Sequence, residues 1–112
     1  MIEYWHNPRC SKSRQGLALL QEKGAEVEVI EYLKTPPAIA RLKEVARLLG
    51  VAPREMMRTK EAAYKELGLA DAGDEELFEA MHRQASLIER PIAINDSKAA
   101  IGRPPENLLA IL

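Results

Sequence analysis

The sequence has little of what several classes of protein and site require. Cys10 is the only cysteine among the 112 residues, so no disulfide can form within the chain. The chain has one thiol and two histidines, and they do not have the short spacing that zinc ligands have in sequence motifs. This argues against a zinc site. No apolar stretch approaches the ~20 residues that cross a bilayer, and Met1 is not followed by the segments of a signal peptide. We therefore expect a cytoplasmic protein with a reduced thiol and no membrane partner.

The chain also lacks an excess of either charge. Sixteen Lys and Arg against seventeen Asp and Glu give a formal net charge of −1. Such a chain has no overall attraction for a phosphate backbone, and we expect no nucleic-acid partner. Its length fits a single domain over residues 1–112, large enough to bury one hydrophobic core.

The first third of the chain has the pattern of a β-α-β unit. The short run Ile2–Trp5 leads into a helix predicted from Cys10 to about Lys23, which Gly24 ends. Residues 27–31 then alternate with period two, as a half-buried strand does. A helical crossover makes the two strands parallel, which is typical of thioredoxin-like and related α/β folds.

The middle third is predicted to be helical throughout. Thr35 is expected to cap one helix, and Pro53 to open a shorter one. Residues 60–67 are expected to form a further turn or two that Gly68 ends, and Asp74 is expected to cap the last helix of this third, over 75–84. We therefore predict a helical insertion at about 37–85.

The last third returns to period two. Residues 92–95 and 98–101 flank Asp96-Ser97, which predicts a tight hairpin. A closing helix over 106–111 follows. The order βαβ, helical insertion, ββα predicts a mixed four-stranded sheet flanked by helices, in the α/β class.

Cys10 is the candidate nucleophile. It falls where a strand ends and a helix begins, and the unpaired backbone N–H groups and the helix dipole at that point favour a thiolate. Its neighbours are polar or cationic, which suits a partly exposed thiol. A free cysteine is also commonly a small buried apolar residue. The local sequence leaves both interpretations open.

Two residues near Cys10 bear on its chemistry. Ser13 stands where the second sulfur of a Cys-x-x-Cys motif would be, so any covalent intermediate must be resolved by a thiol from outside the chain. His6 is expected either to orient or protonate a ligand, or to hydrogen-bond locally and shape the loop.

Three arginines lie at predicted element boundaries: Arg58, Arg90 and Arg103. Loops gather at one end of a sheet, so these guanidinium groups are candidates to converge on Cys10. Arginine suits multidentate binding of an oxyanion, and its charge favours a thiolate. Taken singly, each arginine is also explained as a solvated surface residue, as most arginines are. Pro91 makes the bond after Arg90 a candidate cis peptide.

Five motifs resemble those of a known family in their order and approximate spacing. The resemblance covers nearly the whole chain. They are His6-Asn7-Pro8-x-Cys10-x-x-Ser13-Arg14, Tyr32-Leu33-x-x-Pro36-Pro37, Arg58 with Tyr64-Lys65-Glu66-Leu67-Gly68-Leu69, Leu87-Ile88-x-Arg90-Pro91-Ile92, and Gly102-Arg103-Pro104. The family is that of the arsenate reductases that work with glutathione and glutaredoxin, together with their close relatives and the Spx-type transcription regulators.

The resemblance implies a thioredoxin-like fold and a reaction. Arsenate would be reduced to arsenite through a thiol-arsenate adduct, with glutathione as co-substrate, glutaredoxin as partner, and no bound cofactor or metal. The implied site consists of catalytic Cys10 and His6, oxyanion-binding Arg58, Arg90 and Arg103, and structural Ser13 and Pro91.

Two alternatives remain at this stage. An Spx-like regulator would bind RNA polymerase, but Ser13 removes the Cys-x-x-Cys switch that such sensors use. A glutathione-dependent thiol transferase would need the Cys10 thiolate and not the three arginines. Fold alone does not separate these functions.

Overall fold

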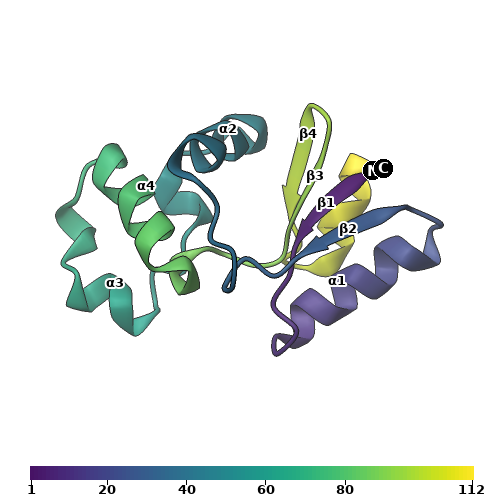
Figure 1. The fold of residues 1–112 in the computed structure, drawn as a ribbon, viewed down its shortest axis with the longest axis horizontal. Coiled ribbons are helices and arrows are strands. Elements are labelled where there is room, and N and C mark those ends of the chain that lie inside the picture. The colour runs from purple at the N-terminus through teal and green to yellow at the C-terminus, as the bar shows by residue number, and fades with distance from the viewer. The chain divides into compact units, whose positions relative to one another are not determined.

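The computed structural model describes residues 1–112, which divide into two compact units. We call residues 1–35 with 90–112 the sheet unit, and residues 36–89 the helical unit. The helical unit covers the region where the sequence predicts an insertion at about 37–85. Both units are drawn in Figure 1.

The sheet unit has a four-stranded mixed sheet with the strand order β2-β1-β3-β4. β1 pairs in parallel with β2, and the β1–β3 and β3–β4 pairs are antiparallel. This confirms the predicted thioredoxin-like α/β arrangement. The elements are β1 (Ile2–Trp5), α1 (Ser11–Glu22), β2 (Val27–Ile30), β3 (Ile92–Asn95), β4 (Lys98–Ile101) and the closing 3₁₀ helix η4 (Pro105–Ile111).

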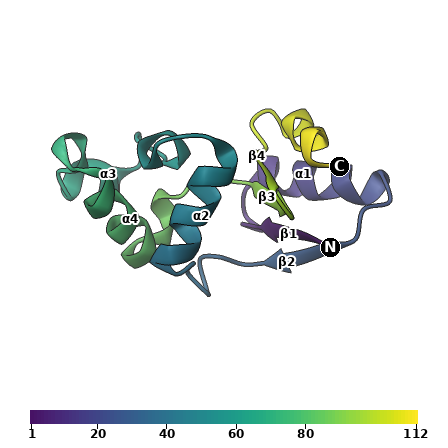
Figure 2. The same cartoon turned by 90° about the horizontal axis from the view of Figure 1, so that it is seen from above.

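One face of this sheet is covered by α1 and η4, which pack against each other and lie side by side in Figure 2. Their apolar side chains meet those of β1 and β3 in one buried cluster: Ile2, Tyr4, Leu20, Ala93, Leu108 and Ile111. β2 is an edge strand, and Val29 in it is 43% exposed. The regular alternation predicted for residues 27–31 is therefore not observed, because an edge strand is covered less than a central one.

Gly16 lets α1 approach the sheet closely. A Cβ at this position would lie 2.7 Å from Leu108 Cδ1 and against the Tyr4 hydroxyl, which donates a hydrogen bond of 2.6 Å to the Ser13 carbonyl.

We expect Gly16→Ala to lower the free energy of unfolding by about 1–3 kcal/mol, because the added methyl group overfills the core. Urea denaturation measures this. Glu22→Ala, at an exposed position of the same helix, is the control and should change stability by less than about 0.5 kcal/mol.

The helical unit is built from short helices, as predicted, and α2 packs against α4. Its buried side chains include Leu42, Val45, Met56, Leu77, Phe78 and Met81. The elements are α2 (Ile39–Leu49), η1 (Pro53–Met56), α3 (Ala62–Glu66), η2 (Leu69–Asp71), α4 (Asp74–Arg83) and η3 (Ala85–Leu87).

Two predicted helix caps are wrong. Thr35 does not cap α2, which begins after Ala38, and its hydroxyl instead donates to the Glu31 carbonyl at 3.4 Å. The two prolines that follow Thr35 disfavour helical geometry in the residue before each, so the chain stays extended for longer. Asp74 lies inside α4 and not at its cap. Gly73 takes that place, and its N–H donates to the Glu76 carboxylate at 3.4 Å.

Arg54 organises the helical unit, although nothing in its local sequence distinguishes it from a surface cation. Its guanidinium donates to the carbonyls of Leu69 and Ala72, both at 2.9 Å, and to the Tyr64 hydroxyl. The Ala72 carbonyl lies outside the helices, and the Leu69 carbonyl also accepts the Ala72 N–H at 3.1 Å in η2. Arg54 therefore holds together the segment that contains the Tyr64 to Leu69 motif.

Candidate active site

The candidate site lies at one edge of the sheet in the sheet unit. A row of paired residues crosses the sheet at this edge: Ile30, Trp5, Ile92 and Ile101. Residues 6–10 follow β1 here, and residues 31–34 follow β2. Arg90 and Pro91 immediately precede β3, and Arg103 comes shortly after β4. Four segments that are distant in sequence therefore meet at one edge because of strand order and direction.

Cys10 is the N-cap residue of α1, with extended backbone geometry (φ −94°, ψ 122°), and is half-buried. Burial alone would raise the pKa of its thiol. The Ser13 N–H, the Arg90 guanidinium, the Lys12 N–H and the Arg103 guanidinium act in the opposite direction and hold the pKa below its ordinary value. Of the two interpretations that the sequence leaves open, the structure favours the thiolate.

Arg103 reaches the thiol directly. Its Nη2 lies 3.8 Å from Cys10 Sγ, and its Nε donates to the Arg90 carbonyl at 2.9 Å. The Gly102 N–H donates to the Pro91 carbonyl at 2.8 Å, which joins the end of β4 to the segment before β3. The Arg90–Pro91 bond is cis, and so is Arg103–Pro104, for which no cis bond was predicted. Two of the three candidate arginines thus act on the thiol within the sheet unit.

His6 and Ser13 form a buried hydrogen-bonded pair. His6 is 8% exposed and Ser13 is fully buried, and His6 Nδ1 lies 2.7 Å from Ser13 Oγ. The Asn7 N–H donates to the same oxygen at 3.0 Å. Burial lowers the pKa of His6, Glu31 raises it and Arg14 lowers it, with a net decrease. The lowered pKa favours the neutral imidazole, and the observed partner of His6 is Ser13 in the first turn of α1.

Ser13 is the common partner in this network, so we expect Ser13→Ala to destabilise the protein. The change leaves the Asn7 N–H and the His6 ring nitrogen without their buried partner, at a cost of about 1–3 kcal/mol. Thermal unfolding at pH 7 measures the loss. Ser11→Ala, at an exposed position of the same helix, is the control. A Ser13→Ala variant as stable as the control would show that the network does not hold the loop.

Arg58 belongs to the helical unit, where both its backbone and its side chain are fixed. Its N–H donates to the Leu87 carbonyl at 2.7 Å, next to the bridge between Met57 and Ile88. Its guanidinium Nη1 lies 2.9 Å from Glu61 Oε2. The ion pair with Glu61 leaves other N–H groups of the Arg58 guanidinium available for a ligand. The proximity of Arg58 to Cys10 stays a prediction.

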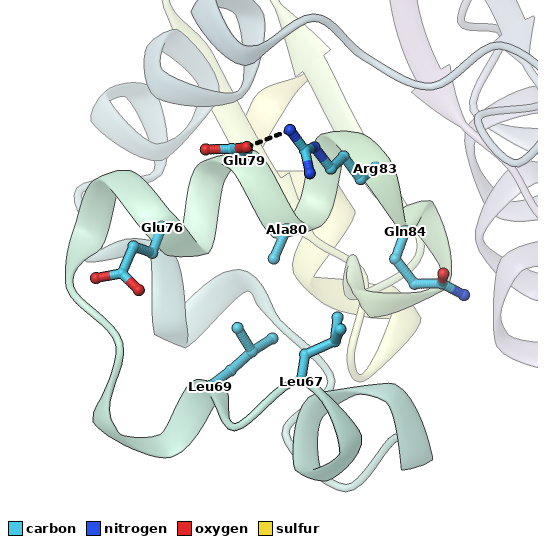
Figure 3. Close-up of a pocket in the computed structure, with 7 residues that line it drawn as sticks. All are labelled: Leu67, Leu69, Glu76, Glu79, Ala80, Arg83 and Gln84. Atoms are coloured by element: carbon cyan, nitrogen blue, oxygen red, sulfur yellow. Dashed lines mark ion pairs between the residues drawn. The ribbon is translucent and has the colours of Figure 1, made fainter.

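Each unit also carries a hollow. A hollow in the sheet unit beside residues 6–10 has a volume of about 400 Å³ and is lined by residues 6–9 together with Glu31, Leu33 and Lys34. The one in the helical unit has a volume of about 350 Å³ and is shown in Figure 3, where Leu67 and Leu69 lie beneath α4. Glu79 and Arg83 in its wall are paired with each other at 2.6 Å. Without a nucleophile, this second hollow is not a candidate active site.

Two further findings bear on the kind of site. No group of three or more His, Cys, Asp or Glu side chains is arranged to hold a metal ion. None of the helices is both long enough and apolar enough to pass through a membrane.

Comparison with known proteins identifies the family. The family model described as ArsC matches residues 5–111. The uncharacterized protein YfgD of Escherichia coli is 50% identical over 99% of this chain and 96% of its own length. An arsenate reductase of Neisseria meningitidis serogroup A is 48% identical over 99% and 97%. The solved arsenate reductase structure from Vibrio cholerae superposes with a TM-score of 0.97 at 48% identity, over 99% of this chain and 97% of that one. This chain belongs to the ArsC family.

Proposed function

We propose that this protein is an oxidoreductase that reduces arsenate to arsenite, using the Cys10 thiolate as nucleophile and glutathione as the external reductant. The observation that carries the proposal is the Arg103 guanidinium, 3.8 Å from a cysteine at a helix N-terminus. Relatives at 48–49% identity over nearly the whole chain are arsenate reductases, which supports arsenate as the substrate.

The arginines supply the binding site for an oxyanion. Arg90 and Arg103 lie at the sheet edge beside the thiol, and we propose Arg58 as the third donor. Guanidinium groups match the geometry of tetrahedral oxyanions, and they stabilise charge that moves onto oxygen during displacement. The same charges keep Cys10 ionised, so one set of residues both activates the nucleophile and holds its substrate.

The reaction proceeds by displacement at arsenic. The Cys10 thiolate forms an S–As bond while one As–O bond breaks, and that oxygen leaves as water after protonation. A glutathione thiolate then forms an S–S bond with Cys10 as the S–As bond breaks. The bonding pair stays on arsenic, which is thereby reduced from As(V) to As(III) and released as arsenite. A second thiol exchange, which we assign to glutaredoxin or to another glutathione, frees the Cys10 thiolate.

The need for an external thiol follows from the site. Ser13 holds the place of a resolving cysteine, and its hydroxyl is buried against His6 and Asn7. We propose that His6 shapes this loop as a neutral group, and that no bound cofactor takes part. A reducing compartment such as the cytoplasm would maintain both the thiol and its donor.

A coupled assay tests the proposal. The purified protein is incubated with arsenate, glutathione, glutaredoxin and glutathione reductase, and NADPH oxidation is followed together with arsenite formed. We expect one arsenite for each NADPH consumed, and no turnover without arsenate. Reduction of mixed disulfides in the absence of any arsenate reduction would support the thiol transferase instead. Recovery of RNA polymerase with a protein that reduces neither substrate would support the regulator.

A further inference from the structure

We propose that the hollow beside residues 6–10, which we call the Cys10 loop, is the docking site of the resolving thiol. We propose further that it selects a thiol bearing carboxylates, of which glutathione is the example. This inference rests on the proposed function and adds a binding site to it. The hollow is lined by the loop residues 6–9 and by Glu31, Leu33 and Lys34. Its volume of about 400 Å³ is in the range of small-molecule sites.

Strand order places this hollow and the arginines on opposite flanks of Cys10. The Cys10 loop follows β1, which lies between β2 and β3 (Figure 2). Residues 31–34 follow β2 on one flank. Arg90 precedes β3 and Arg103 follows β4 on the other. The oxyanion and the incoming thiol thus have separate places along the same sheet edge.

This separation suits the second chemical step. The thiolate that resolves the adduct forms a bond to Cys10 Sγ while the S–As bond breaks, so it approaches the sulfur from the side opposite arsenic. With the arsenate oxygens held by Arg90 and Arg103, we assign the approach of the thiol to the β2 flank of the sulfur. A thiol docked there approaches in line without displacing the arginines from the oxyanion.

The charges in the hollow match those of glutathione. The Arg9 guanidinium makes no hydrogen bond or ion pair within the chain. The hydrogen bond that Arg9 does make comes from its backbone N–H, which donates to Asn7 Oδ1 at 3.0 Å. Lys34 lies 3.3 Å from Glu31, and both side chains are substantially exposed. With His6 neutral, two cations face one carboxylate. Glutathione has two carboxylates and one ammonium group, so each of its charges has a counterpart of opposite sign.

Leu33 adds an apolar contact. It lines the hollow and is 46% exposed. Covering it with the methylene groups of a γ-glutamyl chain removes apolar surface from water. Arg9 and Lys34 are therefore assigned to the carboxylates, Glu31 to the ammonium group and Leu33 to the carbon chain.

Steady-state kinetics with two thiols test the assignment. We expect Arg9→Ala and Lys34→Ala each to raise the KM for glutathione about three- to fivefold, since each removes one partly exposed ion pair. The KM for arsenate should not change. With 2-mercaptoethanol, which has no carboxylate, the variants should match the wild type. Lys23→Ala, at the opposite end of α1 from Cys10, is the matched control and should alter no KM.

A titration with S-methylglutathione tests the site without turnover. This thioether has the charges of glutathione and cannot react. In ¹⁵N-labelled wild-type protein we expect amide shifts at Arg9 and Lys34, diminished in the Arg9→Ala/Lys34→Ala double variant. If these shifts are absent in the wild type, or are undiminished in the double variant, the docking site is overturned even if arsenate is reduced. Failure of the wild type to reduce arsenate with any thiol overturns the proposed function, while the titration still decides the site.

Discussion

Replacing Cys10 with serine is expected to lower kcat for arsenate reduction at least about a thousandfold, which corresponds to about 4 kcal/mol of transition-state stabilisation. A serine hydroxyl remains protonated near neutral pH even beside Arg90 and Arg103, so it supplies no anionic nucleophile. It also provides no sulfur from which arsenic can take an electron pair. Because Cys10 is the only cysteine, no other thiol in the chain can substitute for it.

The measurement is the coupled NADPH assay, combined with mass spectrometry of the protein after exposure to arsenate and glutathione. The wild type should carry a glutathione adduct on Cys10 when glutaredoxin is omitted, and Cys10→Ser should carry none. Ser11→Ala, one residue along in α1, should retain turnover and serves as the control. Substantial arsenate reduction by Cys10→Ser would exclude the covalent route.

Replacing Arg103 with alanine is expected to have the second largest effect, lowering kcat/KM for arsenate about 10²–10³-fold. The change removes the guanidinium that lies 3.8 Å from Cys10 Sγ and breaks the bond from its Nε to the Arg90 carbonyl. The substrate loses one oxyanion donor, and Arg90 loses a contact that holds its backbone. Both losses act on the same step, so they are not expected to add simply.

The same substitution should change the pH dependence. Since Arg103 is one of the groups that lower the pKa of Cys10, the variant's thiol should ionise at a higher pH than the wild type's. Its activity should therefore decline sooner as the pH falls. The thiolate also stabilises the folded state at pH values above the unfolded pKa, and that contribution is lost as the pH falls through the folded pKa. In Arg103→Ala, the thiolate should contribute less to the stability of the folded state than it does in the wild type.

Ultraviolet absorbance of the thiolate gives the pKa in each variant, and pH-rate profiles give the kinetic counterpart. Arg103→Lys is the informative control, because it keeps a positive charge but loses the planar fork. It should bring the thiol pKa back toward the wild-type value, while kcat/KM for arsenate stays lowered. An unchanged thiol pKa in Arg103→Ala would show that Arg103 does not act on Cys10.

Much of the architecture was predictable because it is local. Periodicity and breakers located the four strands, and the hairpin at Asp96-Ser97 was placed to the residue. The caps at Thr35 and Asp74 were wrong because capping depends on backbone geometry within a few residues, which consecutive prolines and Gly73 altered. Arg54 was not identified, because its acceptors are carbonyls up to 18 residues away.

By itself, the sequence determined that there is a single thiol at a helix N-terminus, that no second sulfur can resolve it, and that arginines stand at element boundaries. Only the tertiary structure decided that Arg90 and Arg103 act on Cys10 and that His6 is buried against Ser13. It also decided that a hollow lined by charged side chains lies on the other flank of residues 6–10. The physical reason is that composition and periodicity are properties of short segments, whereas the sheet edge exists only once β1 pairs between β2 and β3. That pairing is set by burial of apolar side chains far apart in the chain.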